Sequence, residues 1–166
     1  MMKRWIMFGD YNTWANRRLY AAVAALPPTD FGRDGGAFFR SLRGTLNHIL
    51  VADRIWLGRF EGEPASDLKL DQILHDDLGD LTAAREAEDE RLRAFVGGLD
   101  EKDAERTIVY RRQTSPEEIR QPLEFALAHL FNHQTHHRGQ AHALLTQFGG
   151  PDAGPALDLA FFQRGL

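Results

Sequence analysis

Residues 122–148 read PLEFALAHLFNHQTHHRGQAHALLTQF, the longest uninterrupted helical pattern in the chain. Apolar residues recur through it at three- and four-residue steps, which predicts an amphipathic helix. Pro122 suits the first turn of that helix, where its missing N–H has no partner to lose. The run Gly149-Gly150-Pro151 then breaks the pattern. We therefore expect the last long helix of the protein here.

Three further helical patterns precede this stretch. Each carries an apolar stripe at helical spacing, and they cover about Asp10–Leu26, Phe39–Phe60 and Asp71–Val96. Asp10 is the expected N-cap of the first pattern, and Thr29–Gly36 reads as a surface loop. Strands and helices do not alternate, which argues against α/β folds. The expected fold is an all-α four-helix bundle, formed as a single domain by residues 1–166.

A long connection separates the third pattern from the last long helix. Within it, Arg106–Arg112 contains the one β-branched and aromatic run of the chain, so we expect at most a short hairpin arm. After the last long helix, Ala156–Gln163 holds four large apolar residues that can dock on the bundle: Leu157, Leu159, Phe161 and Phe162.

The composition narrows the function. The chain has 166 residues, of which 43% are hydrophobic and 27% charged, as in globular proteins. It has no cysteine, so any metal must be bound by His, Asp or Glu. The net charge is −4 with scattered Lys and Arg, which makes nucleic acid a poor partner. No apolar run suits a signal peptide or a membrane span, so we expect a cytoplasmic protein without membrane contact.

The histidines are clustered. His129, His133, His136 and His137 lie within nine residues, and His142 follows closely. On a helix, His133 and His137 stand one above the other with Cβ atoms about 5–6 Å apart, so both can reach one ion. The helical wheel turns both toward the bundle interior, where an imidazole without a partner is costly. Core or surface histidines without a metal are the alternative interpretation.

A metal would need a third ligand, and the other two histidines of the chain are His48 and His75. His48 lies on a narrow helix face of mostly small residues, which leaves room for a neighbouring helix or a ligand. His75 stands beside two aspartates and is expected at the solvated surface. His136 lies farther round the wheel and is a weaker ligand candidate, and His129 is expected to neighbour the site rather than bind.

Four stretches resemble the DinB/YfiT-like family of four-helix-bundle metalloenzymes. They are YNTWAN at 11–16, LNHIL at 46–50 with Trp56, NHQTHHRGQ at 132–140 and LDL at 157–159. The resemblance spans residues 10–162 and is specific chiefly through NHQTHHRGQ and the distant histidine. It implies a divalent ion held by His48, His133 and His137, and it favours a homodimer.

Three histidine ligands leave coordination positions open, as in catalytic metal sites. The resemblance implies a metal-dependent enzyme that transfers a low-molecular-weight thiol or hydrolyses a small-molecule substrate. Because the chain lacks cysteine, such a thiol would be a cofactor. The alternative is a non-catalytic metal- or ligand-binding stress-response module. Neutral imidazole ligands do not discriminate among these divalent ions. We expect Zn or Ni, with Fe, Mn or Cu as alternatives.

Two polar residues are candidates for support of this site. Asp53 lies at the centre of the second apolar stripe, where a carboxylate needs a partner. We expect a structural salt bridge with Arg138 or Arg17, and a catalytic base is the alternative. Gln140 lies on the His133 face and could hydrogen-bond a ligand imidazole or a bound water. The motifs HExxH and GxSxG are absent, which removes zincin and serine-hydrolase chemistry.

Overall fold

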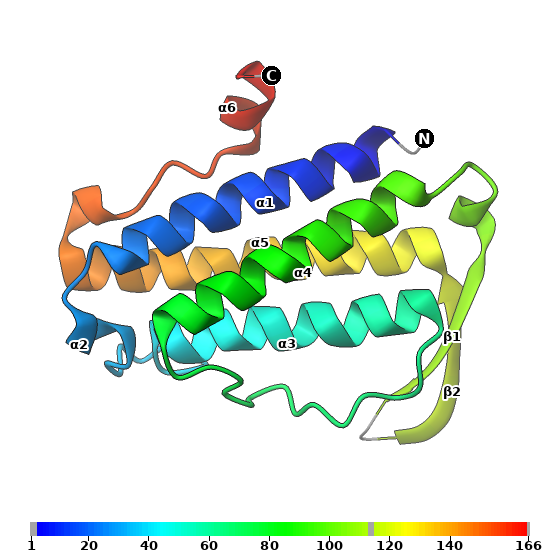
Figure 1. The fold of residues 1–166 in the computed structure, drawn as a ribbon, viewed down its shortest axis with the longest axis horizontal. Helices are drawn as coiled ribbons and strands as arrows, with labels where there is room; N and C mark the ends of the chain where they lie inside the picture. Colours follow the sequence, from blue (N-terminus) through cyan, green and yellow to red (C-terminus); the bar gives the residue numbers. More distant parts are fainter. Residues whose placement is uncertain (1–2, 113–114, 166) are drawn as a thin grey trace.

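A computed structural model describes residues 3–112 and 115–165 of the chain and shows a bundle of long helices (Figure 1). The four long helices are α1 (Lys3–Ala24), α3 (Leu42–Glu61), α4 (Leu78–Gly98) and α5 (Leu123–Gly149). The short elements are α2 (Pro28–Phe31), η1 (Asp103–Glu105), β1 (Thr107–Arg112), β2 (Ser115–Pro122), η2 (Pro151–Ala153) and α6 (Leu159–Arg164). The predicted all-α four-helix bundle is confirmed.

The long helices pack around a shared interior. Helix α1 packs on α4 and α5, and α3 packs on α5 and α4. The hairpin β1–β2 stands at one end of the bundle, and the connection from α3 to α4 runs along the outside of α3 (Figure 1). Helix α6 docks against α1, where Phe162 packs on Tyr11 with ring centroids 5.6 Å apart. The expected docking of the C-terminal segment is therefore confirmed.

Helix α1 starts at Lys3, so the prediction that Asp10 caps it is wrong. The residues before Asp10 continue the helix because Trp5 and Phe8 stack on Phe131, with ring centroids 6.0 and 5.4 Å apart. Gly9 lies within the helix and does not interrupt it. A Cβ at this position would lie only 3.0 Å from the side chain of Val96. The glycine instead permits a close approach of α1 and α4.

Other boundaries follow from capping. Asp77 accepts hydrogen bonds from the first N–H groups of α4, which begins at Leu78 rather than at the predicted Asp71. The preceding backbone is held out of the helix because Asn47 binds the N–H groups of Leu74 and His75. The predicted loop 29–36 contains most of the short helix α2.

The predicted hairpin is confirmed. The sequence did not indicate its second strand, β2. Strand β1 pairs antiparallel with β2, and Tyr110 stands opposite Ile119. The sequence of β2, SPEEIRQP, has one β-branched residue, so its propensity does not predict a strand. Pairing with β1 supplies the missing stabilisation.

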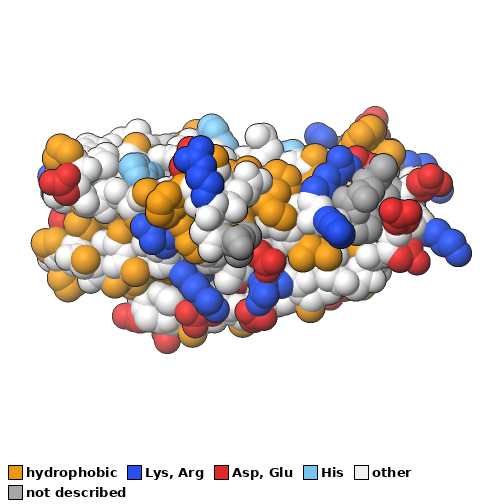
Figure 2. All heavy atoms as spheres, turned by 90° about the horizontal axis from the view of Figure 1, so that it is seen from above, with side chains coloured by type: hydrophobic (Ala, Val, Ile, Leu, Met, Phe, Trp, Pro, Cys, Tyr) orange, Lys and Arg blue, Asp and Glu red, His pale blue; other side chains and the backbone are white. Residues whose placement is uncertain are grey.

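Charges of both signs and hydrophobic side chains are interspersed over the face that carries α1 and α6 (Figure 2). Of the helices in residues 3–112 and 115–165, none combines the length and the apolar composition that crossing a membrane requires.

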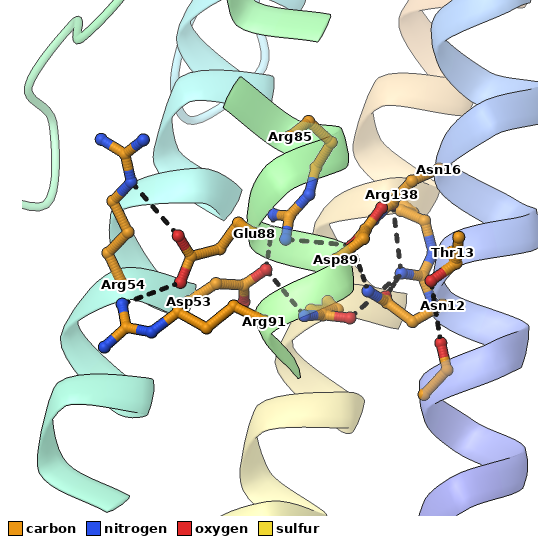
Figure 3. Close-up of polar contacts among 12 residues, drawn as sticks. Asn12, Thr13, Asn16, Asp53, Arg54, Arg85, Glu88, Asp89, Arg91 and Arg138 are labelled. Atoms are coloured by element: carbon orange, nitrogen blue, oxygen red, sulfur yellow. Dashed lines mark hydrogen bonds and ion pairs between the residues drawn. The ribbon is translucent and has the colours of Figure 1, made fainter. Parts of the chain in front are cut away.

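A buried polar network joins all four long helices (Figure 3). Asp53 of α3 accepts hydrogen bonds from Arg85 of α4 at 2.6 Å and from Gln134 of α5 at 2.7 Å. Asp89 of α4 pairs with Arg85 at 3.0 Å. The remaining members are buried as well: Asn12 and Asn16 of α1, which donate to Asp89, and Arg138 of α5, which donates to Asn12.

The partner of Asp53 corrects a prediction. The carboxylate is in a structural salt bridge, but with Arg85 and not with Arg138 or Arg17. The charged middle of α4 faces inward here, whereas its sequence shows charges on most faces. Burial raises the pKa of Asp53 to about 6, against the attraction of Arg85, so the carboxylate remains ionised at pH 7.

We expect Arg85→Met to destabilise the protein strongly. The substitution leaves Asp53 and Asp89 buried without their cation, which costs about 3–5 kcal/mol. The measurement is the free energy of unfolding in urea. The matched control on the same helix is Arg93→Met, because Arg93 pairs with Asp10 at the surface and its loss costs under about 1 kcal/mol. Equal losses in the two variants would contradict this account.

Candidate metal centre

Three histidines from two adjacent helices converge at the α3–α5 interface. The Nε2 atom of His48 lies 3.1 Å from Nε2 of His133 and 3.2 Å from Nε2 of His137. One nitrogen from each ring fits within a span of 4.8 Å. Ligand nitrogens about 2.0–2.1 Å from a shared ion stand roughly 3.0–3.4 Å apart. The three side chains therefore have the spacing of a ligand set.

Two of the rings are held in a defined orientation. Nδ1 of His48 donates to the backbone oxygen of Leu70, and Nδ1 of His137 donates to the side-chain oxygen of Gln140, each at 2.7 Å. With the proton on Nδ1, both rings direct an Nε2 lone pair at the shared point. Two lone pairs that face each other cannot form a hydrogen bond, so a cation is the group that this arrangement suits.

The environment keeps the cluster neutral. Burial lowers the pKa of His48 to about 4 and that of His133 to about 3. Burial also lowers the pKa of His137. Neutral imidazoles are the form that binds metals. Nδ1 of His133 is buried and has no hydrogen-bond partner among residues 3–112 and 115–165.

Phe39 covers one side of the cluster. Its ring stacks on His48 with centroids 3.8 Å apart and meets the edge of His137 at 5.6 Å. Arg40, the next residue, has a φ of 69°, which turns the chain sharply into α3. Gly44 lets this turn lie against the helix, because a Cβ there would stand 2.1 Å from the Phe39 carbonyl oxygen. The sequence does not reveal this role of Phe39, because nothing in its local spacing links it to a histidine.

The other candidate residues either neighbour the histidine cluster or lie outside it. Gln140 binds a cluster histidine, as expected, and also contacts the exposed His136 at 3.3 Å. His129 is a neighbour, with its ring 5.9 Å from that of His133. His75 does not join the cluster, and its backbone is bound by Asn47.

A cavity of about 1060 Å³ opens beside His48 and His133. Helix α3, residues 63–70 and the hairpin β1–β2 form most of its wall. Its volume is at the upper end of the range of small-molecule sites. The cluster therefore has a protein-covered side, at Phe39, and a side that a substrate could reach.

Fold and site together define a class: a four-helix bundle with an inward-facing three-histidine cluster beside a cavity. The sequence profile of the DinB family matches residues 1–164, and the chain belongs to this family. It is similar to Protein DinB of Bacillus subtilis (strain 168), with 28% identity over 154 residues, which cover 84% of this chain and 83% of that protein.

The fold is also that of a solved structure. YfiT from Bacillus subtilis, described as a probable metal-dependent hydrolase with an unusual four-helix bundle topology, matches with a TM-score of 0.67. The match has 18% identity and covers 89% of this chain and 87% of that one. At this identity the likeness establishes the bundle topology and nothing about the substrate.

We expect Gly44→Ala to destabilise the protein by about 1–3 kcal/mol, because the new Cβ would collide with the backbone of Phe39. The control is Gly97→Ala near the end of α4, where nothing lies within 4 Å of the new atom. There the helix propensity of alanine should stabilise the protein by up to about 1 kcal/mol. Thermal unfolding measures both effects, and a neutral Gly44→Ala would show that the turn does not require glycine.

Proposed function

We propose that this protein is a metal-dependent hydrolase of small molecules, with one divalent ion held by His48, His133 and His137. The observation that carries the proposal is the convergence of three neutral imidazoles, of which His48 and His137 direct Nε2 lone pairs at the shared point. The family membership and the likeness to YfiT support it. Zn or Ni is the proposed ion, with Fe, Mn or Cu as alternatives, since the donor set does not discriminate among them.

A divalent ion at this position would supply a Lewis acid and would lower the pKa of a bound water toward about 7. The chain would contribute the orientation of the ligands and cover on one side of the site. Leu70 and Gln140 hold two of the imidazoles by their Nδ1 protons, and Phe39 excludes water from one side. Three neutral ligands bring no negative charge, so the site favours an anionic ligand on the open side.

His129 is the titratable neighbour on that open side. It lines the cavity, and burial lowers its pKa, with a further lowering by Arg59 and Arg112. Its imidazole is therefore neutral at pH 7 and can accept a proton from an attacking water. Glu63 also lines the cavity, but its carboxylate is bound to Arg91 at 2.9 Å. We infer that His129 is the general base.

Transfer of a low-molecular-weight thiol is the second candidate reaction. A site of neutral donors favours an anionic thiolate, and the cavity volume can hold a thiol together with an electrophile. A non-catalytic binding module is the third possibility, and it requires the metal but no turnover. The homodimer and the cytoplasmic location inferred from the sequence stay predictions.

Metal content tests the ligand set. We expect one divalent ion per chain in tag-free protein, and its loss in His48→Ala, His133→Ala and His137→Ala. The controls are His75→Ala and His142→Ala, because neither side chain belongs to the cluster. Elemental analysis gives the stoichiometry, and circular dichroism checks that each variant is folded. Retention of the ion in His48→Ala with its loss in His75→Ala would show that the ligand set is wrong.

Orientation of His137 by Gln140 has a measurable consequence. Gln140→Leu removes the acceptor of the Nδ1 proton, so we expect metal affinity to fall by about 10–100-fold. Competition with a chelator measures this affinity. The control on the same helix is Gln147→Leu, an exposed position that should leave the affinity unchanged. A Gln140→Leu protein with wild-type affinity would contradict the orienting role.

The reaction class is tested with a panel of activated 4-nitrophenyl esters. We expect release of 4-nitrophenolate by the metal-loaded protein, and a fall of at least about 100-fold in His137→Ala, because this variant would lose one of the three residues proposed to hold the ion. His142→Ala should keep the rate. Turnover that requires an added thiol, with the thiol found in the product, would instead establish the transferase. A metal-loaded protein inert in both assays would favour the binding module.

A further inference from the structure

The cavity leads away from the histidine cluster along a row of aromatic rings. From His133 the row continues to His129, whose centroid is 5.0 Å from that of Trp56. Trp56 in turn meets Tyr110 of the hairpin, with centroids 5.4 Å apart. All four side chains line the cavity. A flat or apolar part of a ligand could therefore lie along this wall.

Arg59 stands at the far end of the row. Its guanidinium carbon lies 4.5 Å from the centroid of Trp56 and 4.4 Å from that of Tyr110. Contact with two rings holds this half-buried cation in place before any ligand arrives. A fixed guanidinium loses little freedom when it forms hydrogen bonds with an anion.

The positive charge at this end is not balanced by the described part of the chain. Within residues 3–112 and 115–165, the cavity residues Arg59, Arg111 and Arg112 form no ion pair with a carboxylate. Two other arginines of the cavity wall are paired, Arg54 with Glu88 at 3.4 Å and Arg91 with Glu63 at 2.9 Å.

The pKa of Arg59 and the ion pairs of the acidic wall residues also indicate an unbalanced positive charge at this end of the cavity. Burial lowers the pKa of Arg59, Tyr110 opposes this in part, and the nearby charge of Arg112 lowers the pKa further. The acidic residues of the cavity wall are engaged elsewhere, since Glu63 binds Arg91 and Glu118 binds Arg120 at 3.0 Å. An anion between Arg59 and Arg112 would relieve the repulsion between the two guanidinium groups.

We propose that the hairpin end of the cavity binds an anionic oxygen group of the substrate, a carboxylate or a phosphate, and that Arg59 is the residue that positions it. The substrate would then be a small organic anion with a flat or apolar segment between its anionic group and the bond that reacts near the histidines. The identity of that bond rests on the proposed hydrolase function, whereas the binding of the anion does not.

Calorimetry on the tag-free full chain tests the proposal with three naphthalene probes: 2-naphthoate, 2-naphthyl phosphate and the neutral 2-naphthamide. We expect at least one anion to bind about 10-fold more tightly than the amide, which corresponds to about 1.4 kcal/mol. Arg59→Met should abolish this preference, and the relative affinities of the two anions identify the preferred group. The matched control is Arg91→Met, which removes an arginine of the same cavity that is already paired.

Two further variants keep the test decisive. Arg112→Gln changes an exposed residue of the hairpin, and it should weaken the anion preference by about 2–5-fold even if Arg59→Met fails to fold. His137→Ala removes a proposed metal ligand and should leave the preference intact. No preference in the wild-type protein would overturn the anion site alone. A preference that survives Arg59→Met and disappears in His137→Ala would place the anion at the histidine cluster and would also overturn it.

Discussion

The buried network around Arg85 is the constraint on which the rest of this structure depends. Two carboxylates, Asp53 and Asp89, and two guanidinium groups, Arg85 and Arg138, lie inside the bundle at 2% exposure or less. Their formal charges cancel, and amide side chains of α1 and α5 satisfy further hydrogen bonds. A different helix register would leave buried charges unpaired, which is costly in a low-dielectric interior. The network therefore favours one arrangement of the four helices.

The same arrangement places the histidine cluster. On α5, His133 is followed directly by Gln134, and His137 by Arg138, so both cluster residues of this helix have a network residue as their neighbour in the chain. On α3, Asp53 follows His48 by little more than one helical turn. A register shift that broke the network would also separate the Nε2 atoms of the cluster. The network and the cluster meet at the α3–α5 interface, where Gln134 binds Asp53 and the histidines converge.

The site is asymmetric in a way that suits chemistry on a ligand. Phe39 and the turn before α3 cover one side, while the cavity under the hairpin opens the other. The hairpin contributes little to the hydrophobic core beyond Ile108, yet its β1 strand supplies Tyr110 and Arg112 to the cavity wall. The part of the fold that departs from a plain helical bundle is therefore the part that forms a wall of the cavity beside the histidine cluster.

The sequence by itself determined the long helices and the pairing of His133 with His137, because helical periodicity and i,i+4 geometry are local. It also indicated that Asp53 needs a partner and that Gln140 could orient a ligand ring. Only the tertiary structure decided that the partner is Arg85. The middle of α4 carries charges on most faces, so no apolar stripe revealed which charges are buried. The contacts of Phe39 and Leu70 with His48, and the row of rings that ends at Arg59, likewise join segments distant in the chain. Such contacts depend on how the elements pack, which no local pattern encodes.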